Sequence, residues 1–154
     1  MTQLRLAFIG GGNMAGAIFG GLLWGGWPSE SITVVEPFDE QRQRIAAARP
    51  GVRLLARADA SLRDADMVVW AVKPQSFAEA AAACAPHVSH ALQLSVMAGL
   101  RSDAIVEATG SQRVVRAMPN TPALIGKGIS GLFARDAASA DDRAAVERVL
   151  APTG

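Results

Sequence analysis

Cysteine, aromatic residues, an excess charge of either sign and long apolar runs are all scarce in this sequence. Cys84 is the single cysteine, so the chain can form neither an internal disulfide nor a thiolate metal cluster. Lys and Arg number 15 against 14 Asp and Glu, which gives no electrostatic signature of a nucleic-acid or anionic-membrane partner. The most apolar stretch, residues 15–27, contains five glycines and is too short to span a bilayer. The first residues lack the basic flank, apolar run and cleavage site of a signal peptide. We therefore expect a cytoplasmic protein with no nucleic-acid or membrane partner.

Half of the residues are hydrophobic, although aromatic residues make up only 5% of the chain. Ala, Val, Leu and Ile supply most of this apolar content, which suits helices packed on buried parallel strands better than a β-sandwich. A length of 154 residues is that of one ordinary domain. We expect a single domain over residues 1–154.

Short apolar runs alternate with helical patterns along the chain. The first apolar run ends at glycines, and Pro37 follows the second. The expected strands are 4–9, 32–35, 52–55, 67–72, 91–96, 113–117 and 128–134, and the expected helical segments are 13–23, 39–48, 60–64, 76–84, 103–109 and 140–150. This alternation, with short connections, predicts an α/β fold with a doubly wound, mostly parallel sheet.

A glycine-rich turn joins the first expected strand to the first expected helix. Its pattern G-x-G-x-x-A places Gly10, Gly12 and Ala15 at the positions of a dinucleotide-binding fingerprint. Gly10 permits a tight exit from the strand, Gly12 lets the backbone approach a pyrophosphate, and Ala15 lets the helix pack closely on the strand. Amides at the start of the helix then point at the phosphates. The alternative is an ordinary glycine turn, but its place between a strand and a helix favours a Rossmann-type nucleotide site.

Glu36 ends the second expected strand. A carboxylate there can accept hydrogen bonds from an adenosine ribose, and it opposes a 2′-phosphate. The nearest arginines along the chain, Arg42 and Arg44, lie on the following helix. This local chemistry favours NADH over NADPH, and the alternative is a solvated charge at the end of a strand.

Three later loops also follow expected strands, where ligands bind in open α/β sheets. Lys73 offers a cation to phosphate or ribose, or else is a surface lysine. Around Gly99, small residues leave room for a flat ring or simply allow close packing. In the third loop, two prolines flank Asn120 and Thr121 and stiffen a turn that presents both polar side chains to a ligand or is simply a rigid turn.

Several strings of residues, taken together and in order, resemble the N-terminal domain of pyrroline-5-carboxylate reductase. They are Gly10-Gly11-Gly12-Asn13-Met14-Ala15, Ala71-Val72-Lys73-Pro74-Gln75, Ser95 with Ala98-Gly99, Arg116 with Met118-Pro119-Asn120-Thr121-Pro122, and Gly126-Lys127-Gly128. The resemblance covers nearly the whole chain. The segments 72–74 and 118–122 are far more specific than the glycine turn.

The resemblance implies reduction of the cyclic imine 1-pyrroline-5-carboxylate to L-proline, the last step of proline biosynthesis, by NADPH or NADH. It implies that Asn120 is catalytic, near the nicotinamide and the imine. It further implies the following cofactor-binding residues: Gly10, Gly12, Asn13, Met14, Ala15, Glu36, Ala71, Val72, Lys73, Pro74, Ala98 and Gly99. No metal is expected.

In one respect the sequence departs from this family. Family members continue into a C-terminal helical domain that forms the homo-oligomer and carries the pocket for the substrate carboxylate, and no such segment occurs in this chain. We therefore expect cofactor binding without turnover. Two alternatives stay open: a related dehydrogenase of the β-hydroxyacid type, and a non-catalytic NAD(P)-binding module.

Three further residues have simpler interpretations. Cys84 lies in an Ala-rich helical pattern and is expected in the core. Trp24 and Trp27 follow the first helix and are expected to pack against the sheet or against a partner domain.

Overall fold

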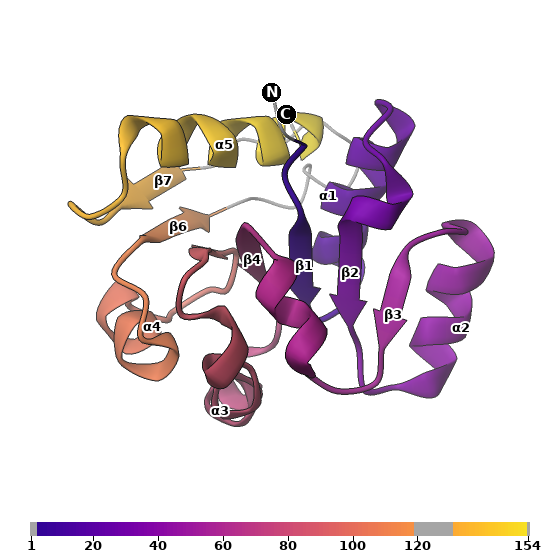
Figure 1. Cartoon of the computed structure of the whole chain (residues 1–154), viewed down its shortest axis with the longest axis horizontal. Helices are drawn as coiled ribbons and strands as arrows, with labels where there is room; N and C mark the ends of the chain where they lie inside the picture. Colours follow the sequence, from indigo (N-terminus) through magenta and orange to yellow (C-terminus); the bar gives the residue numbers. More distant parts are fainter. Residues whose placement is uncertain (1–2, 119–130, 154) are drawn as a thin grey trace.

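The structure is a computed structural model, and it describes residues 3–118 and 131–153. Strands and helices alternate along the chain (Figure 1). The strands are β1 (Leu6–Ile9), β2 (Ile32–Val35), β3 (Arg53–Leu55), β4 (Met67–Trp70), β5 (Leu92–Ser95), β6 (Val114–Met118) and β7 (Gly131–Ala134). The helices are α1 (Asn13–Trp24), α2 (Asp39–Ala48), α3 (Phe77–Val88), α4 (Ser102–Thr109) and α5 (Ala140–Leu150). Short 3-10 turns are η1 (Ser29–Ser31), η2 (Ala60–Asp64), η3 (Pro74–Ser76) and η5 (Ala151–Thr153).

The strands form one sheet in the order β3-β2-β1-β4-β5-β6-β7. All pairs from β3 to β6 are parallel, and β7 runs antiparallel to β6. The chain builds outward from β1 in one direction and then from β4 in the other, which is the doubly wound arrangement expected from the sequence. The Rossmann-like, mostly parallel fold is therefore confirmed.

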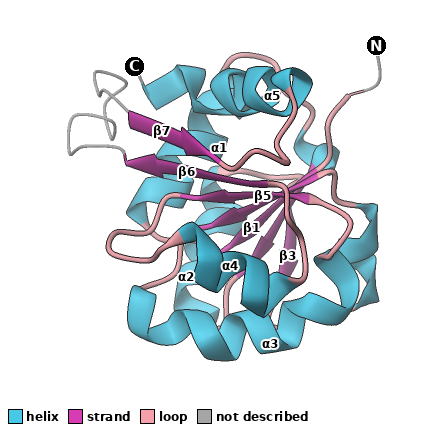
Figure 2. Cartoon of the chain, turned by 90° about the vertical axis from the view of Figure 1, so that its left-hand side faces the viewer, coloured by secondary structure: helices cyan, strands magenta, loops and turns pink. Residues whose placement is uncertain are grey.

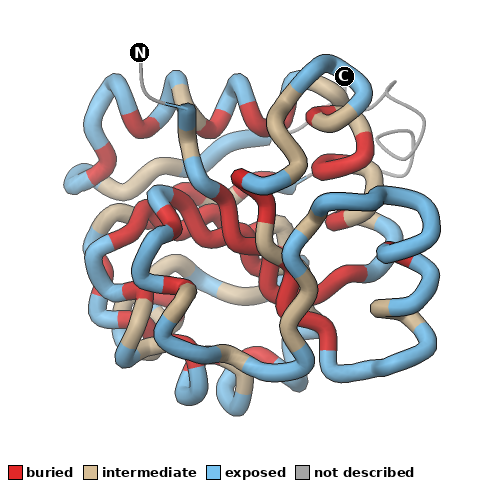
Figure 3. The backbone as a smooth tube through the Cα atoms, turned by 45° about the vertical axis from the view of Figure 1, so that its right-hand side comes forward, coloured by how far each residue is buried: buried red, intermediate tan, exposed pale blue. Residues whose placement is uncertain are grey.

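Helices cover both faces of the sheet, as Figure 2 shows for α5 above it and α3 and α4 below it. One core lies between the sheet and α1, α2 and α5, and includes Phe8 and Phe19, whose rings meet edge to face. The second core lies under α3, α4 and η2 and includes Trp70, which packs edge to face on Phe77. Because both faces are covered, strands such as β1 and β4 are buried along their whole length (Figure 3).

The expected bounds agree with the structure at 32–35, 39–48, 60–64 and 140–150 and differ elsewhere by a few residues. The largest error is at α3, which does not stop near Cys84 but continues past Pro86 to Val88. Cys84 and Val88 are one helical turn apart and both buried, so core packing on this face offsets the hydrogen bond that the proline removes. Of the last expected strand, 131–134 is β7, while 128–130 lies outside the described residues.

Cys84 is buried, as expected, and desolvation raises the pKa of its thiol to about 11. Of the two alternatives for Trp24, packing against the sheet is wrong, because its side chain is 91% exposed at the end of α1. Trp27 is half-buried, beneath the guanidinium of Arg148, which lies 5.5 Å from the ring centroid. Within the described part of the chain, every helix is too short or too polar to cross a membrane.

Candidate functional site

The carboxyl ends of β1 and β4 meet at the point where the strand order reverses, and the loops that leave them start side by side. The amide of Gly10 donates to the carbonyl of Val35 at 2.9 Å, and that of Ala71 donates to the carbonyl of Ile9 at 2.9 Å. On the next strand, the amide of Glu36 continues the ladder to Leu55 at 2.9 Å. Open α/β sheets bind ligands at this kind of reversal point.

Each glycine of the turn after β1 has a different reason to be glycine. Gly10 has a φ of +97°, and a Cβ there would lie 2.6 Å from the carbonyl oxygen of Ala71. A Cβ on Gly11 would lie 2.8 Å from the Cδ1 of Ile45, inside the core beneath the turn. A Cβ on Gly12 would meet no protein atom within 4 Å. Packing therefore requires the first two glycines, whereas the third leaves an open approach to the backbone.

Helix α1 begins directly after Gly12, and no side chain caps it. Its first turn also holds no acidic residue. The first amides of a helix have no acceptor within the helix itself, and the helix dipole adds partial positive charge at the same place. Asn13 is exposed there, Met14 half-buried, and Ala15 buried against the sheet, so the small side chain expected at the third motif position is in the core. The start of α1 is thus able to receive an anion.

Glu36 is buried, with 7% of its surface exposed, at the end of β2. Its carboxylate accepts two backbone hydrogen bonds, from Gly11 to Oε1 at 3.1 Å and from Phe38 to Oε2 at 3.0 Å. The alternative of a solvated charge at the end of a strand is therefore wrong. Gln41 on α2 adds a second tie, because its Nε2 donates to the carbonyl of Gly11 at 2.7 Å. Together these bonds hold the glycine turn against β2 and α2.

A cavity of about 330 Å³ opens beside this turn. Its walls come from β1, the loops after β2 and β3, and α3. Phe38 is 72% exposed, and Arg57 is also exposed. The lining residues are Ile9, Gly10, Val35, Pro37, Phe38, Ala56, Arg57, Ala58, Val72, Ser76, Glu79, Ala80, Ala83 and Cys84. This largely apolar space has the size and position to receive a flat ring next to the turn.

The other predicted site residues follow β4 and β5. Ala71 and Val72 are half-buried, and both lie against Gly10, within 3.3 Å of where its Cβ would be. Lys73 is exposed, and Pro74 begins the turn η3 that leads into α3. Ala98 and Gly99 are exposed in the loop after β5, where Gly99 has a φ of +74°. The predicted catalytic residue Asn120 lies outside the described residues.

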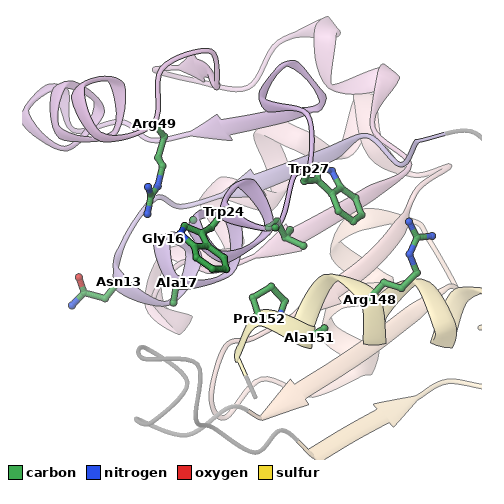
Figure 4. Close-up of a pocket in the computed structure, with 13 residues that line it drawn as sticks. Asn13, Gly16, Ala17, Trp24, Trp27, Arg49, Arg148, Ala151 and Pro152 are labelled. Atoms are coloured by element: carbon green, nitrogen blue, oxygen red, sulfur yellow. The ribbon is translucent and has the colours of Figure 1, made fainter.

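A larger hollow, of about 1210 Å³, lies along the outer side of α1. Small residues of one helix face form its floor, with Trp24 and Trp27 beside them and Arg49 and Arg148 on opposite sides (Figure 4). The residues that line this hollow include Asn13 at the start of α1 but none of residues 9–12 of the glycine turn. We assign the site to the smaller cavity, because it adjoins the carboxyl ends of the strands and the glycine turn.

Three residues of the site were not singled out from the sequence. Gly11 was treated as a spacer in the motif, although its amide binds Glu36 and its lack of a Cβ lets the turn pack on Ile45. Phe38 and Arg57 are 19 positions apart in the sequence, and only the fold brings both to the wall of one cavity. Their positions just beyond β2 and β3 are the signal that would have found them.

Comparisons with known proteins agree with this geometry. A protein of Haemophilus influenzae named pyrroline-5-carboxylate reductase is 40% identical over 161 residues, which cover 100% of this chain and 57% of that protein. The structure of a pyrroline-5-carboxylate reductase from Coxiella burnetii has a TM-score of 0.91 at 29% identity, over 99% of this chain and 57% of the other. That of Plasmodium falciparum pyrroline carboxylate reductase with NADP bound has a TM-score of 0.83 at 24% identity, over 100% and 56%, a likeness in fold.

These names confirm the resemblance read from the motifs. The chain spans a little over half the length of the relatives it matches. Residues 5–99 also match the sequence model of a family described as NADP oxidoreductase, coenzyme F420-dependent. Because the match covers more than half of this chain, the chain belongs to this family of oxidoreductases.

Proposed function

We propose that this chain is the cofactor-binding domain of a pyrroline-5-carboxylate reductase. In the complete enzyme it would serve the NAD(P)H-dependent reduction of 1-pyrroline-5-carboxylate to L-proline, a step of proline biosynthesis in the cytoplasm. One observation carries the proposal: an uncapped helix start follows a turn in which Gly12 alone leaves its Cβ position open. The relatives named pyrroline-5-carboxylate reductase over the whole length of the chain support the choice of reaction.

The residues present fit a dinucleotide. The amides at the start of α1 would receive the pyrophosphate, and Gly12 would let it approach the backbone. The cavity lined by Phe38 and Arg57 would receive the adenine, and Lys73, exposed in the loop after β4, would offer a cation to the dinucleotide. When bound, the reduced nicotinamide supplies a hydride.

The chain's own part in the reaction is positioning. Gly10, packed on Ala71, and Glu36, bonded to Gly11, fix the turn before any ligand arrives. A preformed turn lowers the entropy that binding must overcome. At the far end of the site, Ala98 and Gly99 would leave room for the nicotinamide, and Asn120 would face the imine. The relatives extend well beyond the matched length, so we expect the imino-acid pocket and the homo-oligomer to involve that further part.

Calorimetric titration of the 154-residue chain with NADPH and NADH tests the proposal, followed by an assay with 1-pyrroline-5-carboxylate. We expect saturable binding of at least one dinucleotide and no turnover by this chain alone. Mixing the chain with the remaining part of a relative such as that of Haemophilus influenzae tests whether turnover needs that part. Failure to bind either dinucleotide would refute the proposal.

A further inference from the structure

The peptide unit between Gly11 and Gly12 lies between two peptides that other contacts already hold. Before it, the amide of Gly11 donates to the carboxylate of Glu36 at 3.1 Å. After it, the carbonyl of Gly12 accepts the first hydrogen bond of α1, from the amide of Gly16 at 2.8 Å. The peptide between them takes part in neither bond, so neither bond fixes its orientation.

A side chain of α2 supplies the contact that does. Gln41 is half-buried, and its Nε2 donates to the carbonyl of Gly11 at 2.7 Å. Its Oε1 accepts from the Nη1 of Arg44 at 3.4 Å, so the two ends of the side-chain amide have different partners. Ile45 lies one helical turn after Gln41, and a Cβ on Gly11 would lie 2.8 Å from its Cδ1. Helix α2 therefore holds Gly11 both by close packing and by a hydrogen bond.

The hydrogen bond from Gln41 also sets the direction of the Gly12 amide. The peptide is trans and planar, so its C=O and its N–H point in opposite directions. Because the carbonyl of Gly11 points toward α2, the N–H of Gly12 points away from α2. Gly12 is exposed, and a Cβ there would meet no protein atom within 4 Å, so its backbone is open to a ligand.

Glycine on both sides makes this peptide easy to reverse. Turning it over changes mainly the ψ of Gly11 and the φ of Gly12, which is −80°. Glycine adopts φ of either sign, so the reversed peptide meets no Cβ penalty at either residue. It would present the carbonyl oxygen of Gly11, with its partial negative charge, where the N–H now points. An anion at the start of α1 would then meet repulsion in place of a hydrogen bond.

We propose that Gln41 is a positioning residue of the phosphate turn, which holds the peptide between Gly11 and Gly12 so that the amide of Gly12 faces the pyrophosphate of a dinucleotide. The inference rests on the proposed function, because it concerns the pyrophosphate end of the same site. Gln41 acts through the peptide and does not touch the ligand. Its effect is therefore the same for NADH and NADPH, which carry the same pyrophosphate.

Calorimetry on the 154-residue chain tests the inference without any assay of activity. The probe is ADP-ribose, which carries the adenosine and the pyrophosphate, alongside NADH and NADPH. Gln41→Leu removes the donor, and we expect the affinity for all three to fall by about tenfold, ~1.4 kcal/mol. Gln43→Leu is the matched control, because Gln43 is exposed on the same helix and donates to Asp39 at 2.8 Å. It should bind all three as the unmodified chain does, and a thermal melt of each variant shows that it is folded.

Gln41→Glu distinguishes the orientation of the peptide from packing, because it keeps the shape of the side chain and replaces its donor by an acceptor. The introduced carboxylate would repel the carbonyl of Gly11 and attract the amide of Gly12, so at about pH 8 the affinity for ADP-ribose should fall further than in Gln41→Leu. As the pH falls to about 5, the carboxyl group regains a proton that it can donate. The affinity relative to that of the unmodified chain should then recover.

The charged neighbours of position 41 are Glu36 and Arg44, and both are present in every variant, so the ratio to the unmodified chain cancels their own titration. Gln43→Glu adds the same charge away from the peptide, and its ratio should stay flat with pH. In the unmodified chain, the ¹H–¹⁵N resonance of the Gly12 amide should shift when ADP-ribose binds, a result that depends on no variant.

Three results would overturn the inference while the proposed function stands. They are unchanged affinity in folded Gln41→Leu or an equal loss in Gln43→Leu, no recovery of Gln41→Glu at low pH, and a Gly12 resonance that does not move when ADP-ribose binds. Absence of binding by ADP-ribose, NADH and NADPH refutes the proposed function itself.

Discussion

Glu36 accepts a hydrogen bond from the amide of Gly11, a residue 25 positions earlier in the chain, across 3.1 Å. This contact joins the end of β2 to the turn after β1, and the second oxygen of the same carboxylate binds Phe38 at 3.0 Å. The residue expected to face a ribose therefore also braces the turn that would hold the phosphates. A ligand would meet a site whose turn is already in place, and binding would require little further ordering.

Substitutions of two glycines of this turn should affect different properties, dinucleotide binding at Gly12 and folding stability at Gly11. Gly12→Ala adds a methyl group where no protein atom lies within 4 Å, so we expect a melting temperature close to that of the unmodified chain. The same methyl group would occupy the path of the pyrophosphate, so dinucleotide affinity should fall by at least about tenfold, ~1.4 kcal/mol. Thermal melts and calorimetry on one preparation measure both quantities.

Gly11→Ala is the matched comparison. Its Cβ would lie 2.8 Å from the Cδ1 of Ile45 and 3.1 Å from the Cγ1 of Val34. We expect this overpacking to cost about 1–3 kcal/mol of unfolding free energy. A destabilised Gly12→Ala, or Gly12→Ala that binds dinucleotide normally, would contradict the assignment of the turn.

The pair of Arg113, the residue before β6, and Asp142 on α5 predicts a pH dependence of stability. The guanidinium donates to both carboxylate oxygens, at 3.0 and 2.7 Å, and Ser139 adds a capping box. The hydrogen bond from Arg113, followed by those within the cap, lowers the pKa of Asp142. A lowered pKa means that the folded state holds the proton less tightly than the unfolded state. The stabilisation is therefore complete above the unfolded value of about 3.9 and is lost as the pH falls through the folded value.

Asp142→Asn should cost about 1–2 kcal/mol at pH 7, a range reduced because Arg113 is partly exposed. Its stability should also fall less steeply below pH 4 than that of the unmodified chain, as followed by urea unfolding at several pH values. Glu40→Gln breaks the exposed pair with Arg44 and serves as the control, with an expected change within about 0.5 kcal/mol. Parallel curves for Asp142→Asn and the unmodified chain below pH 4 would count against the pair.

The thiol of Cys84 should be unreactive in the folded chain. It is 1% exposed, and burial raises its pKa to about 11, so at pH 8 almost no thiolate is present. We expect reaction with a disulfide reagent such as DTNB to be limited by unfolding and to accelerate in urea. Ala82→Cys in a Cys84→Ala background moves the thiol to an exposed position of the same helix and should react rapidly without denaturant. Rapid labelling of native Cys84 would show that α3 opens locally.

Local pattern was enough to predict where strands end and which turn holds the glycines, because both depend on residues close together in the sequence. The bounds of β2, α2 and α5 agree with the expectation for this reason. Local pattern does not show which residues far apart in the sequence the fold brings together. The hydrogen bond from Gly11 to Glu36, and the cavity that Phe38 and Arg57 both line, depend on loops brought together by three parallel strands. The continuation of α3 past Pro86 depends likewise on a core that the helix covers.

The buried side chain of Gln93 gives the sharpest test of the second core. Its Oε1 accepts from the indole Nε1 of Trp70 at 2.7 Å, and its Nε2 donates to the carbonyls of Val88 at 2.8 Å and Ala91 at 3.1 Å. Gln93→Leu keeps the volume but leaves the indole N–H and the Val88 carbonyl without these partners. We expect a loss of about 2–4 kcal/mol in urea unfolding, whereas Gln112→Leu on the surface should change stability by less than about 0.5 kcal/mol.

A second substitution distinguishes the lost hydrogen bond from a general disturbance of packing. Trp70→Phe removes the indole N–H, so in a Gln93→Leu background it should cost less than it does alone. The two changes would then show a coupling of about 1 kcal/mol or more in a double-mutant cycle. Strict additivity would mean that the indole N–H finds another partner when Gln93 is gone. In that case Trp70 and Gln93 would contribute to the core through packing alone. The stabilising hydrogen bond of Gln93 would then be the one to the carbonyl of Val88 at the end of α3.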